Sequence, residues 1–197
     1  MPRHYRLERH GALRQGGLIL NLVEVARPVP RGRSSADDAL VDPRTRPLAV
    51  IVSADCDLEW DYQRRRGLGS PDKELDTTIL AEVFDAAYLW NRWSAEPPNA
   101  RRRRLDDIDK HQEPRYHRMP SIPPLVTPSA LPVELDTLWV EPKLFIDFKR
   151  VFALPTEEIY YQLRRGWAKR AGTLVPPFVH HMTQRCYDYL GRIGVDE

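Results

Sequence analysis

The strongest constraint on the fold is a short apolar run, Leu48 to Ser53, which reads Leu-Ala-Val-Ile-Val-Ser. A β-branched run of this length predicts a strand buried on both faces. Before it, Gly16 to Val25 places alternating apolar residues after a glycine pair, a pattern typical of a strand. After it, Thr77 to Phe84 predicts a strand that breaks near Phe84 and continues as a short helix. The first half of the chain is therefore expected to be rich in β-structure.

Weaker strand patterns follow a polar stretch in the middle of the chain. The stretch, about residues 94–114, is expected to be a polar insertion of loop character. Beyond it, Arg115 to Ile122 could form one strand, and Thr137 to Val140 could pair with Leu144 to Phe152. The last of these runs alternates with a period of two, as a strand does. The β-rich core is thus predicted over about residues 14–152.

The C-terminal segment has helical character. Thr156 after a proline is a good N-cap, and it predicts a helix from Glu157 to Arg170 that stops near Gly172. A second helix is expected from the proline pair at 176–177 to about Leu190. Apolar residues at spacings of three or four give it one buried face, made of Phe178, Met182, Cys186 and Tyr189.

Together these patterns predict one α+β domain over residues 1–197. Its core would be a small SH3-like β-barrel or a twisted antiparallel sheet. A C-terminal helical pair, about residues 156–194, would close it.

Composition limits the classes of function. The formal net charge is only +2, and of the 30 basic residues five are Lys and the remaining 25 are Arg. Neither a signal peptide nor a membrane-spanning run is visible, so a cytoplasmic protein with no membrane partner is expected. Cys56 and Cys186 lie 130 residues apart in no zinc or redox spacing. No glycine-rich phosphate loop or spaced ligand set is present, so no metal and no cofactor is predicted.

The segment Asp55-Cys56-Asp57, directly after the buried run, is the most unusual one. Cys56 could act as a nucleophile, although two flanking acids would raise its pKa. Asp55 and Asp57 could instead bind a hard cation, joined by Glu59 or Glu82. A structural interpretation packs Cys56 as a small buried residue while the acids accept hydrogen bonds in a turn. Contact of the acids with a ligand or partner is the remaining alternative.

The histidines and arginine runs favour structural or solvated roles. Adjacent helical residues point about 100° apart, so His180 and His181 do not converge on one metal, and one of them should face water. His111 and His117 flank a loop and have no spaced partner. Arg101 to Arg104 is expected in a solvated loop, because three acids follow it and weaken its field.

Part of the chain resembles a known family. The order Gln15-Gly-Gly-Leu-Ile-Leu-Asn, then Arg46-Pro-Leu-Ala-Val-Ile-Val-Ser, then Thr77-Thr-Ile-Leu-Ala-Glu is similar to the MazF/PemK toxins. Members of this family are SH3-like barrels that cleave RNA. The resemblance implies that Arg46 and either Thr77 or Thr78 serve the cleavage, with an RNA 2′-OH attacking the scissile phosphate.

A second resemblance carries no activity. The Ser53-x-Asp-Cys-Asp57 strand end, with the helical tail after Phe178, is similar to a group of uncharacterised bacterial proteins. The leading hypothesis is a non-catalytic binding or regulatory module of a bacterial intracellular system, in contact with protein or RNA. A MazF/PemK-like endoribonuclease is the first alternative. A Cys- or metal-dependent enzyme centred on Asp55, Cys56 and Asp57 is the second.

Overall fold

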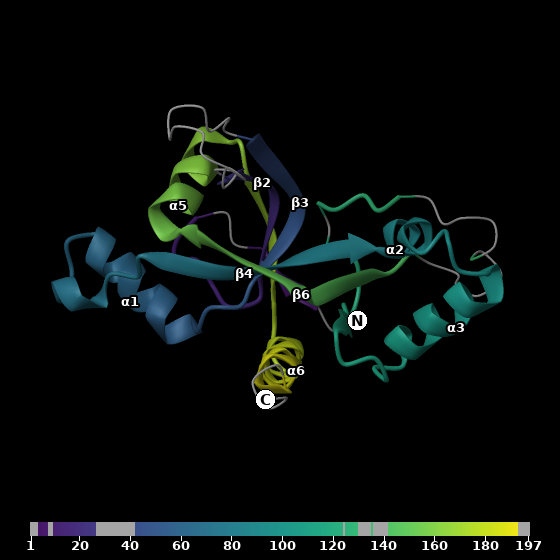
Figure 1. Cartoon of the computed structure of the whole chain (residues 1–197). Helices are drawn as coiled ribbons and strands as arrows, with labels where there is room; N and C mark the ends of the chain where they lie inside the picture. The colour runs from purple at the N-terminus through teal and green to yellow at the C-terminus, as the bar shows by residue number, and fades with distance from the viewer. Residues whose placement is uncertain are drawn as a thin grey trace, which may run out of the picture.

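The computed structural model describes residues 4–7, 10–26, 42–123, 125–129, 135 and 142–192. Over these residues seven strands form one antiparallel sheet in the order β1-β7-β2-β3-β4-β6-β5. Figure 1 labels β2, β3, β4 and β6 among them. The strands are β1 (Tyr5–Arg6), β2 (Gly17–Ala26), β3 (Asp42–Ile51), β4 (Thr77–Asp85), β5 (Tyr116–Arg118), β6 (Leu144–Pro155) and β7 (Lys169–Leu174). The helices are α1 (Asp55–Arg65), η2 (Pro71–Lys73), α2 (Ala86–Arg92), α3 (Pro98–Asp109), α5 (Thr156–Arg165) and α6 (Phe178–Arg192).

The sheet is open rather than closed into a barrel. β1 and β5 are its two edges, and every strand pair among the described residues is antiparallel. The expected α+β class is therefore confirmed, while the SH3-like barrel is not.

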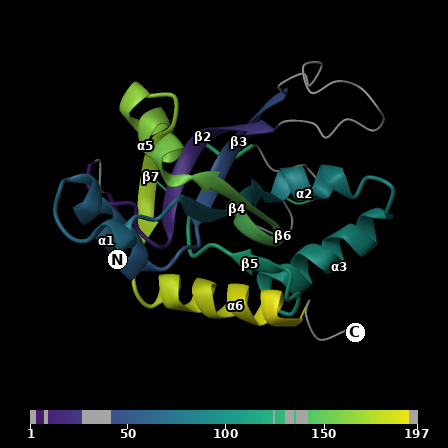
Figure 2. The same ribbon diagram turned by 60° about the vertical axis from the view of Figure 1, so that its left-hand side comes forward.

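Both faces of the sheet are covered by helices (Figure 2). On one face α6 packs Met182 and Cys186 against strand residues that include Val50 and Phe148. Phe178 and Tyr189 are half-buried against the same cluster, so the predicted apolar face of this helix is confirmed. On the opposite face, apolar residues of α1 and α5 cover a second cluster that contains Ile51.

The central strands follow the sequence pattern closely. Leu48 to Val52 are all buried, and they belong alternately to the two opposite clusters, as expected of a strand between two apolar layers. β4 ends at Asp85, whose carboxylate accepts a hydrogen bond of 2.7 Å from the Tyr88 amide at the start of α2. The predicted break from strand to helix is thus confirmed, and a side-chain N-cap is its physical cause.

The prediction of a loop-like insertion at residues 94–114 is wrong. Most of this stretch is α3, whose Leu105 and Ile108 are fully buried in a third cluster beside β5 and β6. Its arginines are not simply solvated, because Arg101 lies 4.1 Å over the Trp90 ring and Arg104 lies 4.4 Å over the Trp93 ring. Stacked guanidinium groups of this kind cover apolar surface while they keep their charge.

Both predicted C-terminal helices are present, as α5 and α6, but the first ends earlier than predicted and a strand separates the two. α5 stops at Gly166, which adopts a left-handed conformation (φ 73°) that glycine accepts without strain. The chain then forms β7, which pairs with both β1 and β2 and contains Gly172, the residue expected to stop the helix. A register shift beside Gly172 marks a bulge, so this glycine serves a strand irregularity.

Two of the strands predicted after residue 114 are either shorter than expected or outside the described residues. Of the strand expected over Arg115 to Ile122, only the three residues of β5 are paired. The strand expected over Thr137 to Val140 lies outside the described residues. In the described part of the chain, no helix combines the length and apolar character needed to cross a membrane.

Candidate metal centre

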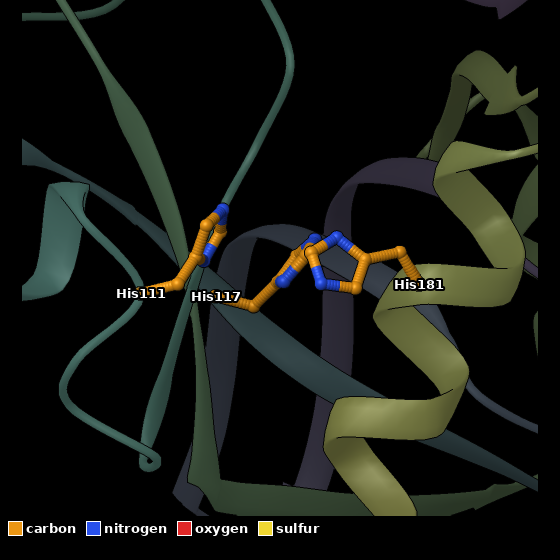
Figure 3. Close-up of side chains that lie close together, drawn as sticks. All are labelled: His111, His117 and His181. Carbon is orange, nitrogen blue, oxygen red and sulfur yellow. The ribbon is translucent and has the colours of Figure 1, made fainter.

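Three histidines from three separate segments of the chain meet between the β5 edge of the sheet and α6 (Figure 3). His111 follows α3, His117 lies in β5 and His181 lies in the second turn of α6. One ligand nitrogen of each ring lies within 4.8 Å of the others. The ring centroids are 5.1 Å apart for His111 and His117, 5.2 Å for His111 and His181, and 5.1 Å for His117 and His181. The rings therefore form a nearly equilateral triangle.

The backbone places His111 by an unusual helix ending. Its amide donates to the Ile108 carbonyl at 3.0 Å, and the Gln112 amide donates to the Asp107 carbonyl at 2.8 Å. These two bonds form a Schellman motif, whose left-handed position is usually a glycine. His111 occupies that position with φ 59°. A side chain there costs roughly 1–2 kcal/mol, and such strain is often found at functional sites.

Arg185 fixes the turn that carries the other two histidines. Its guanidinium donates to the carbonyls of His111 at 3.2 Å, Glu113 at 3.1 Å and Tyr116 at 3.0 Å. Arg185 lies four residues after His181, on the same side of α6. One helix therefore presents a histidine and also holds the segment that presents the other two.

Burial disfavours the protonated form of both His117 and His111. His117 is only 3% exposed, and burial lowers its pKa from 6.5 to about 3. Burial, followed by the positive charge of Arg185, also lowers the pKa of His111. The Nδ1 atoms of His111 and His117 are buried without a hydrogen-bond partner. An unsatisfied buried polar atom costs about 1–3 kcal/mol, and coordination of a metal ion is one way to satisfy a ring nitrogen.

The geometry is close to that of a three-histidine metal site. Two nitrogens at tetrahedral positions, each about 2.0–2.1 Å from one zinc ion, lie about 3.4 Å apart. A separation of 4.8 Å between two ligand atoms would therefore have to shorten by about 1.4 Å. Exposed His181 has room to rotate, and a cavity of about 260 Å³ opens beside the three rings. Three protein ligands and a free position are characteristic of catalytic rather than structural zinc.

None of these three histidines was predicted from the sequence to be a metal ligand, and the structure gives the reason. The prediction that His180 and His181 diverge holds: His180 lines a different cavity, together with Arg14 and Asp55. His181 nevertheless finds two partners, because α6 folds back across β5. No local spacing could have revealed a set drawn from three separate segments.

The segment Asp55-Cys56-Asp57 begins α1 rather than a turn. Asp55 accepts hydrogen bonds from the Gln15 amide at 3.0 Å and from the Arg14 side chain. Cys56 is exposed, so the expectation that it packs as a buried residue is wrong; helical geometry turns it outward while Leu58 is buried. Asp55 and Asp57 belong to no group of three potential metal ligands among the described residues. The three histidines are the one such group found there.

The residues implied by the toxin resemblance lie apart. Arg46 is buried and forms ion pairs with Glu24 and Glu82. Thr78 is fully buried and shares a hydrogen bond of 2.9 Å with the Thr156 hydroxyl, whereas Thr77 is exposed. β3 and β4 pair from Ala49–Glu82 to Ile51–Leu80, so Arg46 lies beyond one end of this ladder and the two threonines lie beyond the other. The structure does not bring Arg46 and these threonines together.

Comparison of the chain with family models, curated proteins and solved structures finds no match. The resemblance to MazF/PemK proteins therefore stays a prediction. A function for this chain is therefore inferred from the geometry of its own residues.

Proposed function

We propose that this protein binds a divalent transition-metal ion through His111, His117 and His181. The observation that carries the proposal is the convergence of three ring nitrogens within 4.8 Å, two of the rings having a buried Nδ1 with no other partner. A merely structural histidine cluster would be expected to satisfy its buried nitrogens with protein hydrogen bonds.

The ligand set restricts the choice of ion. Imidazole nitrogen suits zinc, copper, iron and nickel, whereas magnesium and calcium require several oxygen ligands. A bound zinc ion with a free position lowers the pKa of a coordinated water to about 7. The three histidines would hold the ion, and Arg185 would hold two of them in place.

The test compares adjacent histidines on one helix. His181→Ala removes a proposed ligand, and His180→Ala removes its exposed neighbour, which takes no part in the cluster. Both side chains are exposed on α6, so neither variant should disturb the core. Zinc binding is measured by calorimetry and by thermal unfolding of protein freed of metal by a chelator.

We expect zinc to raise the melting temperature of the wild type. Zinc at one hundred times its dissociation constant adds about 2.7 kcal/mol of stability, which is roughly 5–10 °C for a chain of this size. His180→Ala should keep this shift, and His181→Ala should lose most of it. Equal shifts in the two variants, or no shift in the wild type, would refute the proposal.

A second candidate function is supported by a separate groove. A cavity of about 710 Å³ lies between β3, β4 and α2, and Arg44, Arg150 and Tyr88 line it. The Tyr88 ring is 41% exposed and stacks on Phe84 with centroids 4.3 Å apart. Exposed aromatic rings beside arginines are a common arrangement for single-stranded nucleic acid, so this groove supports the hypothesis of a module that contacts RNA.

Its test is retention of a mixed RNA pool. Tyr88→Ala should weaken retention, whereas Tyr187→Ala, which removes an exposed tyrosine on α6, should not. Cleavage of the pool that disappears in Arg46→Ala would instead favour the toxin-type ribonuclease.

A further inference from the structure

The cavity beside the three histidines is lined by an arginine and by no acidic residue, and this charge favours an anionic ligand. The cavity of about 260 Å³ is lined by the histidine rings, Arg118, Met119 and Phe178, among others, and none of its lining residues is acidic. A divalent ion held by three neutral imidazoles keeps its full charge of +2, because no protein carboxylate neutralises it.

Nearby cations add to this charge. Arg118 lines the cavity, and the Arg185 guanidinium lies against the turn that carries His111, donating to the His111 carbonyl at 3.2 Å. Among the described residues Arg185 forms no ion pair, and its guanidinium donates to three backbone carbonyls instead. Asp109, the acid paired with Arg118 at 3.2 Å, is shared with Lys143 at 2.7 Å.

We infer that the free coordination position beside His111, His117 and His181 binds a phosphate-type oxyanion, with Arg118 as its second contact. This inference rests on the proposed metal binding. An anion neutralises the surplus positive charge, and a guanidinium pairs with phosphate oxygens in a two-pronged geometry. The cavity is smaller than the roughly 300–1,000 Å³ of sites for drug-sized ligands, which suits a single phosphate group.

Arg118 is well placed for such a role. Its side chain is 40% exposed, and its Nε faces Asp109. The fork of five donors on a guanidinium leaves other N–H groups available to the cavity that Arg118 lines. Arg118 would be a binding residue, whereas Arg185 acts through the turn that it fixes.

The experiment uses the full chain loaded with cobalt(II), whose visible absorption depends on its ligands. Inorganic phosphate is titrated into the loaded wild type, Arg118→Gln and Arg103→Gln. Arg103 is an exposed arginine of α3 outside the cavity, so its variant controls for the loss of one positive charge. Cobalt affinity is measured separately for each protein.

Phosphate should change the cobalt spectrum of the wild type and of Arg103→Gln. In Arg118→Gln the phosphate affinity should fall by about ten-fold or more, because a charge-assisted hydrogen bond is lost, while cobalt affinity stays the same. A cobalt spectrum that phosphate does not alter, or that disappears because phosphate removes the metal, would overturn the oxyanion site and leave the metal site standing. Equal phosphate affinity in the two variants would also overturn it. Failure to bind cobalt at all would overturn both.

Discussion

His111→Gly should make the metal-free protein more stable and the metal site weaker. The imidazole is attached to a residue with φ 59° in a helix-ending motif that favours glycine. Removal of Cβ relieves about 1–2 kcal/mol of left-handed strain. The greater conformational freedom of glycine in the unfolded chain lowers the free energy of unfolding by about 0.5–1 kcal/mol.

The net gain is therefore about 0.5–1 kcal/mol, or roughly 1–4 °C in melting temperature for a chain of this length. His111→Ala is the matched control, since alanine also removes the ring but keeps the strained Cβ. Metal-free unfolding in urea should rank Gly above Ala by about this amount. Zinc titration should show that both variants have lost affinity.

Two results would refute this reasoning. Equal stability of the Gly and Ala variants would mean that the backbone strain at position 111 is no larger than the entropy cost of glycine, about 0.5–1 kcal/mol. Zinc affinity unchanged in His111→Gly would mean that the ring is not a ligand, whatever its backbone conformation.

Three other predictions test separate features. A thiol reagent should label exposed Cys56 at once but Cys186 only after unfolding, since Cys186 is buried and its pKa is raised to about 11; labelling of both in the native state would contradict this. Glu82→Gln should destabilise the fold by about 3 kcal/mol in chemical unfolding, because buried Arg46 loses one of its two carboxylates; a change below about 1 kcal/mol would count against a buried network. Below pH 6.5 the unfolded chain binds a proton at His117, whereas the native state binds it only near pH 3. The protein therefore loses stability as the pH is lowered. Between pH 7 and 5 the metal-free wild type should lose about 2 kcal/mol more than His117→Leu, and identical pH dependence would exclude this cause.

The parts of the fold that sequence predicted well are those with a local cause. Leu48 to Val52 form a buried strand because every residue is apolar, and β4 gives way to α2 because Asp85 can cap a helix. The helix α3 was not predicted because most of its residues are charged or polar and only two, Leu105 and Ile108, form a buried apolar stripe. Their burial depends on aromatic partners in other elements, which a sequence window does not contain.

The candidate site could not be predicted for the same reason. His111 and His117 gain a third partner only because α6 crosses the sheet beside β5, and Arg185 then ties the two segments together. The left-handed backbone of His111 is likewise fixed by tertiary context. A histidine after a helix is ordinary in a sequence, and only the folded chain distinguishes this one.

The position of β7 has a consequence for how the protein is made. β2 is flanked by β3 on one side and by β7 on the other, and 142 residues separate the end of β2 from the start of β7. During synthesis on the ribosome, the edge of β2 that pairs with β7 therefore stays unpaired until residues 169–174 have emerged. An unpaired apolar strand edge is a template for association with other chains. Nascent chains halted before β7 should thus be especially dependent on chaperones, whereas completion of this one short strand closes the exposed edge.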